Sequence, residues 1–326
     1  MIVAKPNFPE FLSAPAGAAP DISAGFLCAL DHLGMIEASG DDAPAFLHNQ
    51  LTNDILGLDQ ARAELAGYCS AKGRMLASLM VWRQADRIYL VLPRELLPAF
   101  LKRLQMFVLR SKVTLKDVSD AWLMVGAAAP QWGAAPAVWQ CVSEAAATLI
   151  RVPDAGALQR LLWIGPPEQA QQRWEESASR LPSVAAALWR WSEIIAGLPH
   201  VVEATREQFV PQMINFELVG GVNFKKGCYP GQEVVARSQY LGKTKRRALL
   251  AFTDDTTASA GVEVFSVNDP EQPCGMLVNA ERGPDGRMAC LVEMKLEARS
   301  AAVHLRSING AALEFGELPY AVNADA

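Results

Sequence analysis

Apolar and polar residues along the chain follow two rhythms, which predict helices and strands in turn. A spacing of three and four residues places Phe46, Leu47, Leu51 and Ile55 on one face of a helix over residues 43–56. The same two rhythms predict further helices at 94–110, 167–181 and 231–241, a hairpin at 65–83 that turns at 71–74, and strands at 87–93, 112–119, 121–126, 148–153 and 160–165. Helices mixed with strands that can pair antiparallel are typical of the α+β class.

The pattern becomes less regular in the middle of the chain and simpler at its end. Residues 184–199 are apolar and fit no single element, and residues 203–231 form a long irregular stretch of the kind that is often functional. Beyond residue 242, short strands separated by turn sequences predict a small all-β module, such as a barrel.

These changes in the pattern of apolar and polar residues divide the chain into four predicted parts. They are a loosely ordered leader at 1–20, a first α+β subdomain at 21–130, a second α+β subdomain at 131–243 and the β-barrel at 244–326. The longest apolar run, 121–139, is broken by Pro130 and Pro136, so we expect a buried strand and a loop there and no membrane span.

Charge is distributed unevenly along the chain. The segment 225–247, here called the basic strip, has one acid, Glu233, and seven cations: Lys225, Lys226, Arg237, Lys243, Lys245, Arg246 and Arg247. It carries +6, so the remainder of the chain, whose total charge is −5, carries −11. Such a strip indicates either an anionic ligand or a solvated turn. The acidic remainder argues against direct binding of nucleic acid or of an anionic membrane.

Six cysteines occur without any CxxC pair, so the sequence does not support a zinc ribbon or a local iron–sulfur cradle and indicates reduced, cytosolic thiols. Cys228 is different from the others because it precedes a predicted helix and follows Lys225 and Lys226. Positive charge at that position should stabilise its thiolate, whereas the other five lie in apolar segments and should react slowly. The alternative is a structural cysteine in a turn shaped by Gly227 and Gly231.

Other chemical signals are weak. The sequence "GKT" at 242–244 lacks the upstream glycine of a phosphate loop, and no GxGxxG motif occurs. The four histidines are scattered and suggest no metal site, and His48 fits a solvated or capping residue better than a catalyst.

The segment "KKGCYPGQE" resembles the K-x-G-C-[FY]-x-G-Q-E signature of the YgfZ family. The matching residues are Lys225, Gly227, Cys228, Tyr229, Gly231, Gln232 and Glu233, and Arg237 matches an arginine that follows the signature. "FLHNQLTNDI" and "CSAKGRMLASLMVWR" are similar to segments early in these proteins, so the resemblance covers most of the chain.

The resemblance implies a fold related to the folate-dependent T-protein of glycine cleavage. That fold has two ferredoxin-like α+β subdomains and a C-terminal β-barrel in a ring around a central folate channel. It also implies a folate-binding protein that supports iron–sulfur enzymes, with an enterobacterial member linked to tRNA modification. The expected cofactor is tetrahydrofolate or a one-carbon derivative, the expected partners are iron–sulfur proteins or their assembly factors, and the functional thiol would be Cys228. Glu193, Lys226, Tyr229, Gln232 and Arg237 are the expected folate contacts.

Two departures from T-proteins bear on the reaction. Ala77 and Ser78 stand where T-proteins carry an aspartate pair, and neither can act as a carboxylate base. Ile195 replaces a glutamate that precedes "AG", and Glu193 would substitute for it if this segment were a strand. These departures favour a folate-binding maintenance factor over a folate-dependent one-carbon transferase. The acidic remainder of the chain counts against the third alternative, a tRNA-associated protein that uses the basic strip.

Overall fold

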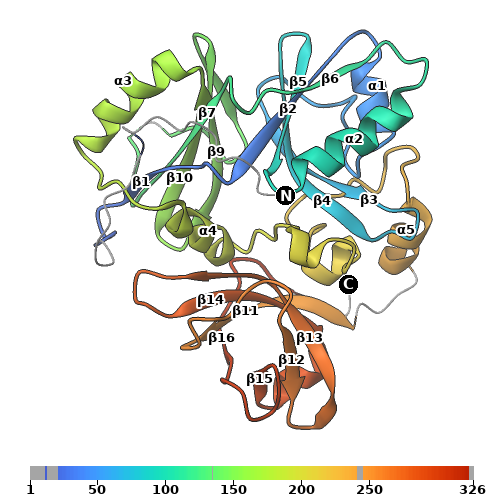
Figure 1. The fold of residues 1–326 in the computed structure, drawn as a ribbon, viewed down its shortest axis with the longest axis vertical. Coiled ribbons are helices and arrows are strands. Elements are labelled where there is room, and N and C mark those ends of the chain that lie inside the picture. Colours follow the sequence, from blue (N-terminus) through green and yellow to red (C-terminus); the bar gives the residue numbers. More distant parts are fainter. Residues whose placement is uncertain (1–11, 13–20, 134, 241–244, 323–326) are drawn as a thin grey trace.

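The computed structural model describes residues 12, 21–133, 135–240 and 245–322, which form three lobes (Figure 1). The first lobe is a five-stranded antiparallel sheet with two helices. In sheet order its strands are β3 (Ala63–Cys69), β4 (Met75–Gln84), β5 (Arg87–Pro93), β2 (Leu33–Ser39) and β6 (Thr114–Asp117), and its helices are α1 (Ala43–His48) and α2 (Leu97–Val108). The predicted hairpin and the helix around residues 97–108 are confirmed.

The second lobe repeats this composition. Its antiparallel sheet has the order β1 (Phe26–Ala29), β7 (Leu123–Ala129), β10 (Leu158–Gly165), β9 (Ala147–Ala155) and β8 (Cys141–Glu144), and its helices are α3 (Pro167–Ala178) and α4 (Ala186–Ile195). Strand β1 precedes the first lobe in sequence but pairs here, so the chain enters the second sheet before it builds the first. The buried strand predicted within 121–139 is β7.

Over residues 245–322 the third lobe is a six-stranded sheet without an α-helix, as its turn-rich sequence predicts. Its strands, in sheet order, are β15 (Val303–Leu305), β12 (Glu263–Ser266), β13 (Asp269–Arg282), β14 (Met288–Lys295), β11 (Arg246–Thr253) and β16 (Glu314–Phe315). A 3-10 helix, η4 (Leu296–Ser300), follows β14. Figure 1 shows this lobe in orange and red below the other two, and α4 of the second lobe contacts its strands β13 and β14.

The irregular stretch between α4 and β11 connects all three lobes. It contains two short 3-10 helices, η2 (Glu203–Thr205) and η3 (Pro211–Ile214), and the helix α5 (Gln232–Tyr240). Residues 198–231, here called the linking segment, contain no strand and no α-helix, and part of the segment is buried. The segment follows α4 directly and leads into α5, so it determines where both helix ends lie.

Two of the predicted elements differ from the structure. The helix predicted over 43–56 ends at His48, and Leu51 and Ile55 are buried beyond its end because the chain turns to form a bridge between Leu51 and Tyr68. The segment around Glu193 is the helix α4, so the premise that it is a strand is wrong. The predicted leader and the "GKT" sequence lie almost entirely outside the described residues. Among the described residues, no helix is long and apolar enough to cross a membrane.

A buried ion pair joins the linking segment to the third lobe. The Arg247 and Glu217 side chains are 2% and 5% exposed and form a salt bridge, and Arg247 Nη1 also donates to the carbonyl of Gln212 at 2.9 Å. Removing one partner of such a pair leaves an unpaired charge in a region without water.

We therefore expect Arg247→Met to lower the free energy of unfolding by about 3–5 kcal/mol. Adding Glu217→Gln to Arg247→Met should recover part of the loss, because the remaining charge disappears. Urea unfolding measures both. Arg237→Met is the matched control, since Arg237 and its partner Glu233 are 70% and 85% exposed and such pairs contribute little. A double variant as unstable as the single one would contradict the explanation.

Candidate functional site

A cavity of about 760 Å³ lies where the three lobes meet. We call it the central cavity. The turn before β2 contributes Asp31 and His32, the end of β5 leads to Arg94 and Glu95, α4 contributes Arg190 and Glu193, and β13 contributes Asn279 and Glu281. Pockets of this size commonly hold small molecules and often lie between domains. The cavity is therefore the first place to look for a ligand site.

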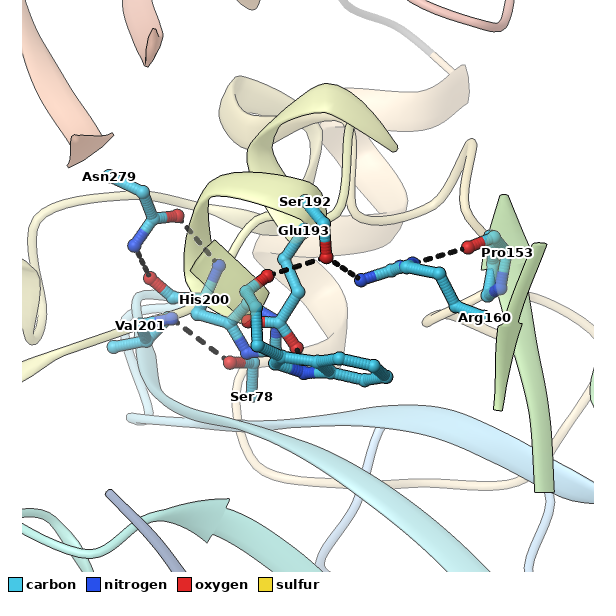
Figure 2. A network of polar contacts seen from close by, with 9 residues as sticks. Ser78, Pro153, Arg160, Ser192, Glu193, His200, Val201 and Asn279 are labelled. Atoms are coloured by element: carbon cyan, nitrogen blue, oxygen red, sulfur yellow. Dashed lines mark hydrogen bonds and ion pairs between the residues drawn. The ribbon is translucent and has the colours of Figure 1, made fainter. Parts of the chain in front are cut away.

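Glu193 is the carboxylate at the centre of the polar network that borders this cavity (Figure 2). It lies in the last turn of α4, which buries Leu188, Trp189 and Ile194 against the surrounding lobes. Trp189 Nε1 donates to Glu193 Oε1 at 3.0 Å, and His200 Nε2 lies 3.3 Å from the same oxygen. Among the described residues, no group donates a hydrogen bond to Glu193 Oε2. One carboxylate oxygen is thus fixed by the protein, and the other is left open.

The surroundings of Glu193 keep it ionised. Burial alone would raise its pKa, but the charge and hydrogen bond of His200, with the charges of Arg160 and His32, outweigh burial and lower the pKa to about 2. For His200 the balance is reversed: burial would lower its pKa, and Glu193 raises it. The cavity therefore presents a negatively charged acceptor at neutral pH.

The backbone around His200 is fixed from two lobes. Asn279 of β13 accepts a hydrogen bond from the amide of His200 and donates to its carbonyl, both at 2.9 Å (Figure 2). Ser78 of β4 accepts the amide hydrogen of Val201 at 2.9 Å. Ser78, which stands where T-proteins carry a carboxylate, thus holds the linking segment, and Ala77 beside it is fully buried. Neither residue offers an acid or a base to the cavity.

A second histidine, His32, also lines the central cavity. Both of its ring nitrogens are buried without a hydrogen-bond partner among the described residues. Burial lowers the pKa of His32 to about 4, so its ring is neutral at pH 7 and has one donor and one acceptor to offer. His32 and His200 are far apart in sequence, and their scattered positions gave no sign that they lie near the same carboxylate.

The signature segment lies elsewhere, against the first lobe. Lys226 is buried there, and its ammonium group donates to the carbonyls of His48 and, at 2.7 Å, Leu51, at and just beyond the end of α1. It also lies 4.9 Å from the centre of the buried Tyr229 ring. Burial lowers the pKa of Lys226 to about 8. This lysine therefore anchors the segment to α1.

Gly231 brings the signature segment close to the predicted hairpin turn. Its φ is +80°, and a Cβ there would lie 2.4 Å from the carbonyl oxygen of Ser70 and 2.6 Å from Gly73. Only glycine fits both the backbone conformation and the contact. The helix α5 begins at the next residue, and the predicted pair of Glu233 and Arg237 is confirmed at 3.1 Å.

Cys228 is the one exposed cysteine of the six, all of which are free thiols within the described chain. Burial raises the pKa values of the other five, to about 12 for Cys69, Cys141 and Cys290. A raised pKa favours the protonated thiol, which agrees with the expectation that these five cysteines react slowly. The exposed thiol is the one in the signature segment.

The basic strip is less basic in the structure than in the sequence. Arg237, Arg246 and Arg247 form salt bridges with Glu233, Glu293 and Glu217, and Lys226 is buried. Lys243 lies outside the described residues, so Lys225 and Lys245 are the exposed lysines of the described part of the strip. A charge count along the sequence already includes Glu233, but it misses Glu293 and Glu217, which come from distant segments.

The structure does not bring all the predicted site residues together. Glu193 lines the central cavity, whereas Lys226, Tyr229, Gln232 and Arg237 do not, and neither does Cys228. Folate contacts by those four signature residues remain a prediction that this cavity does not support. The molecule thus has two separate candidate sites, an acidic site in the cavity and an exposed thiol outside it.

The chain matches no protein-family model. It is 29% identical over 307 residues to the tRNA-modifying protein YgfZ of Klebsiella pneumoniae (strain 342), which covers 91% of this chain and 93% of that protein. It is also 29% identical over 329 residues to the tRNA-modifying protein YgfZ of Sodalis glossinidius (strain morsitans), with 98% of both chains covered.

The fold matches the crystal structure of glycine cleavage system aminomethyltransferase T from Bartonella henselae. The TM-score is 0.74 with 17% sequence identity, and the match covers 91% of this chain and 86% of that one. The predicted T-protein-like fold is thereby confirmed. The chain carries the signature segment and is similar to YgfZ proteins over more than nine-tenths of its length.

Proposed function

We propose that this protein binds a reduced folate, tetrahydrofolate or a one-carbon derivative, in the central cavity. The observation that carries the proposal is Glu193, an ionised carboxylate with one open oxygen at the edge of the cavity. The pterin ring of a folate carries an amino group and ring N–H groups, which need such an acceptor. The folate dependence that the resemblance to T-proteins implies agrees with this chemistry.

The cavity also suits the remainder of a folate molecule. Its volume of about 760 Å³ lies within the range of about 300–1,000 Å³ that is common for ligand pockets. Arg94 and Arg190 line it and offer positive charge for the carboxylates of the glutamate tail, although Arg190 is already paired with Glu281 at 2.6 Å and Arg94 with the exposed Asp120 at 3.4 Å. The sequence links the basic strip to an anionic ligand, but the described residues of the strip do not line this cavity, and two of its seven cations, Arg246 and Arg247, are paired with acids from outside the strip.

The bound folate would not serve in aminomethyl transfer. Ala77 and Ser78 supply no carboxylate, and the Ser78 hydroxyl is engaged by Val201. A one-carbon transferase of the T-protein type therefore remains the weaker alternative. Folate-dependent release of ammonia from an aminomethylated carrier protein would contradict this part of the proposal.

We further propose that the protein supports iron–sulfur enzymes in the cytosol, with Cys228 as its functional thiol. The name of the curated relatives, tRNA-modifying protein, suggests that enzymes of tRNA modification are among those it supports. The exposed position of Cys228 supports a role toward partners, since a thiol must be accessible to react with or coordinate anything outside the protein.

The folate contact can be tested with Glu193→Gln. A hydrogen bond to a charged group contributes about 1.5–3 kcal/mol, so we expect tetrahydrofolate to bind about 10- to 100-fold more weakly. Isothermal titration calorimetry at low salt measures the change. Glu233→Gln, which removes an exposed carboxylate of the signature segment, should leave the affinity unchanged.

An NMR titration checks that Glu193→Gln removes the intended charge. The pKa of His200 is raised by Glu193 against the effect of burial, so it should fall in the variant. The absence of any binding to the unaltered protein would overturn the folate proposal itself. Equal affinities of the two proteins would overturn only the contact.

The role of the thiol can be tested with Cys228→Ser. The variant should fold normally, because the side chain is exposed, yet fail to restore iron–sulfur enzyme activities in a deletion strain. In the unaltered protein, Cys228 should be alkylated at neutral pH well before Cys69 and Cys274, whose raised pKa values suppress the thiolate. Mass spectrometry of the alkylated peptides follows the order.

The matched control is Cys274→Ser, which removes a thiol of the third lobe. Full complementation by Cys228→Ser would mean that the signature cysteine serves only the turn in which it lies.

A further inference from the structure

Arg160 is a fully buried arginine in the middle of β10, in a strand that is otherwise mostly apolar. Its Nε donates to the carbonyl of Pro153 at 2.8 Å, and its Nη1 donates to the hydroxyl of Ser192 at 3.0 Å (Figure 2). The guanidinium carbon lies 5.0 Å from the centre of the Trp189 ring. These contacts hold the guanidinium in one orientation.

One end of this guanidinium has no protein partner. Arg160 Nη2 is buried and makes no hydrogen bond to any described residue. Burial lowers the pKa of Arg160 to about 10, which still leaves it charged at neutral pH. An unsatisfied buried donor of a charged group is costly, so natural proteins rarely keep one without a use for it.

Arg160 lines a second, smaller cavity of about 50 Å³, here called the inner cavity. Glu193 and His200 line both the inner and the central cavity. A buried water needs about 10–15 Å³, so the inner cavity has room for a few waters or for one small polar substituent, but not for a fused ring. Most of its other lining residues are apolar, among them Leu162, Val152 and Trp189.

The two charged groups that border this space need opposite kinds of hydrogen-bond partner. Glu193 Oε2 needs donors, and Arg160 Nη2 needs an acceptor. A ligand that satisfies both carries N–H groups beside a carbonyl oxygen on the edge of one ring. The 2-amino-4-oxopyrimidine edge has this arrangement, and pterins and guanine share it.

We propose that Arg160 Nη2 donates a hydrogen bond to the 4-oxo oxygen of such a heterocycle, whose ring lies in the central cavity and whose oxo group enters the inner cavity, while Glu193 accepts the neighbouring N–H groups. This inference rests on the proposed function, because it specifies which side chains would recognise the pterin ring of a bound folate. It makes Arg160 the residue that distinguishes a 4-oxo ligand from its 4-amino analogue. A charge-assisted hydrogen bond in a space without bulk water is well suited to that discrimination.

The test compares tetrahydrofolate with tetrahydroaminopterin, which differ at position 4 of the ring. Calorimetry should show that the unaltered protein prefers tetrahydrofolate. In Arg160→Met, tetrahydrofolate should bind about 10- to 100-fold more weakly, whereas the affinity for the 4-amino analogue should change by less than about threefold. If Arg160→Met does not fold, Arg160→Lys, which keeps the charge but cannot fill all three hydrogen-bonding positions, serves the same comparison.

Ser192→Ala is the matched control. It removes the acceptor of Nη1 and leaves Nη2 in place, so it should keep the preference for the 4-oxo ligand. Equal weakening of both ligands in Arg160→Met would mean that the arginine only maintains the structure. Unchanged affinities would mean that the inner cavity holds water only. Either result overturns the inference and leaves folate binding intact.

Binding measurements with guanosine and free pterin distinguish a failure of this inference from a failure of the proposed function. If tetrahydrofolate fails to bind but one of these two binds in an Arg160-dependent manner, the folate proposal fails and the inference stands. If no 2-amino-4-oxo heterocycle binds to the unaltered protein, both fail.

Discussion

The arrangement of the three lobes depends on hydrogen bonds between the linking segment and the side chains around it. The linking segment, residues 198–231, contains no strand and no α-helix, and turns and 3-10 helices satisfy part of its backbone. Side chains from the first and third lobes bond further backbone groups. These contacts are Thr52 to Gly221, Asn53 to Gly220, Ser78 to Val201, Asn279 to His200 and Arg247 to Gln212, and the Asn215 side chain of the segment bonds the carbonyl of Ala248. The segment is therefore fixed against both lobes by hydrogen bonds along its length.

The same segment positions both candidate sites. Its first residues bring His200 against Glu193, at the edge of the central cavity, and its last residues form the signature turn that exposes Cys228. The two sites use opposite physical conditions. Glu193 works in a buried place where hydrogen bonds and nearby cations keep it ionised, whereas Cys228 needs access to solvent. A protein that holds a ligand inside and meets partners outside would need both conditions at once.

Much of the structure of the signature segment could be predicted from the sequence, because it depends on residues that are close in the chain. The helix after Gly231, the pair of Glu233 and Arg237, and the contrast between Cys228 and the other cysteines depend on residues close in the chain or on the apolar character of a strand. The alternation of residues likewise predicted the hairpin of the first lobe and the all-β third lobe. These features are determined by neighbours within a few positions.

The tertiary structure decided what depends on distant partners. Lys226, Arg246 and Arg247 look free in the sequence, yet carbonyls and acids from other segments engage them. Glu193 was a candidate on the premise that its segment is a strand, but a helix directs it toward His200. In the sequence, the only indication of a role for Arg160 is that it is a charged residue in a mostly apolar strand. Sequence periodicity determines which face of an element is buried, but whether a buried charge finds a partner is settled only when separate lobes meet.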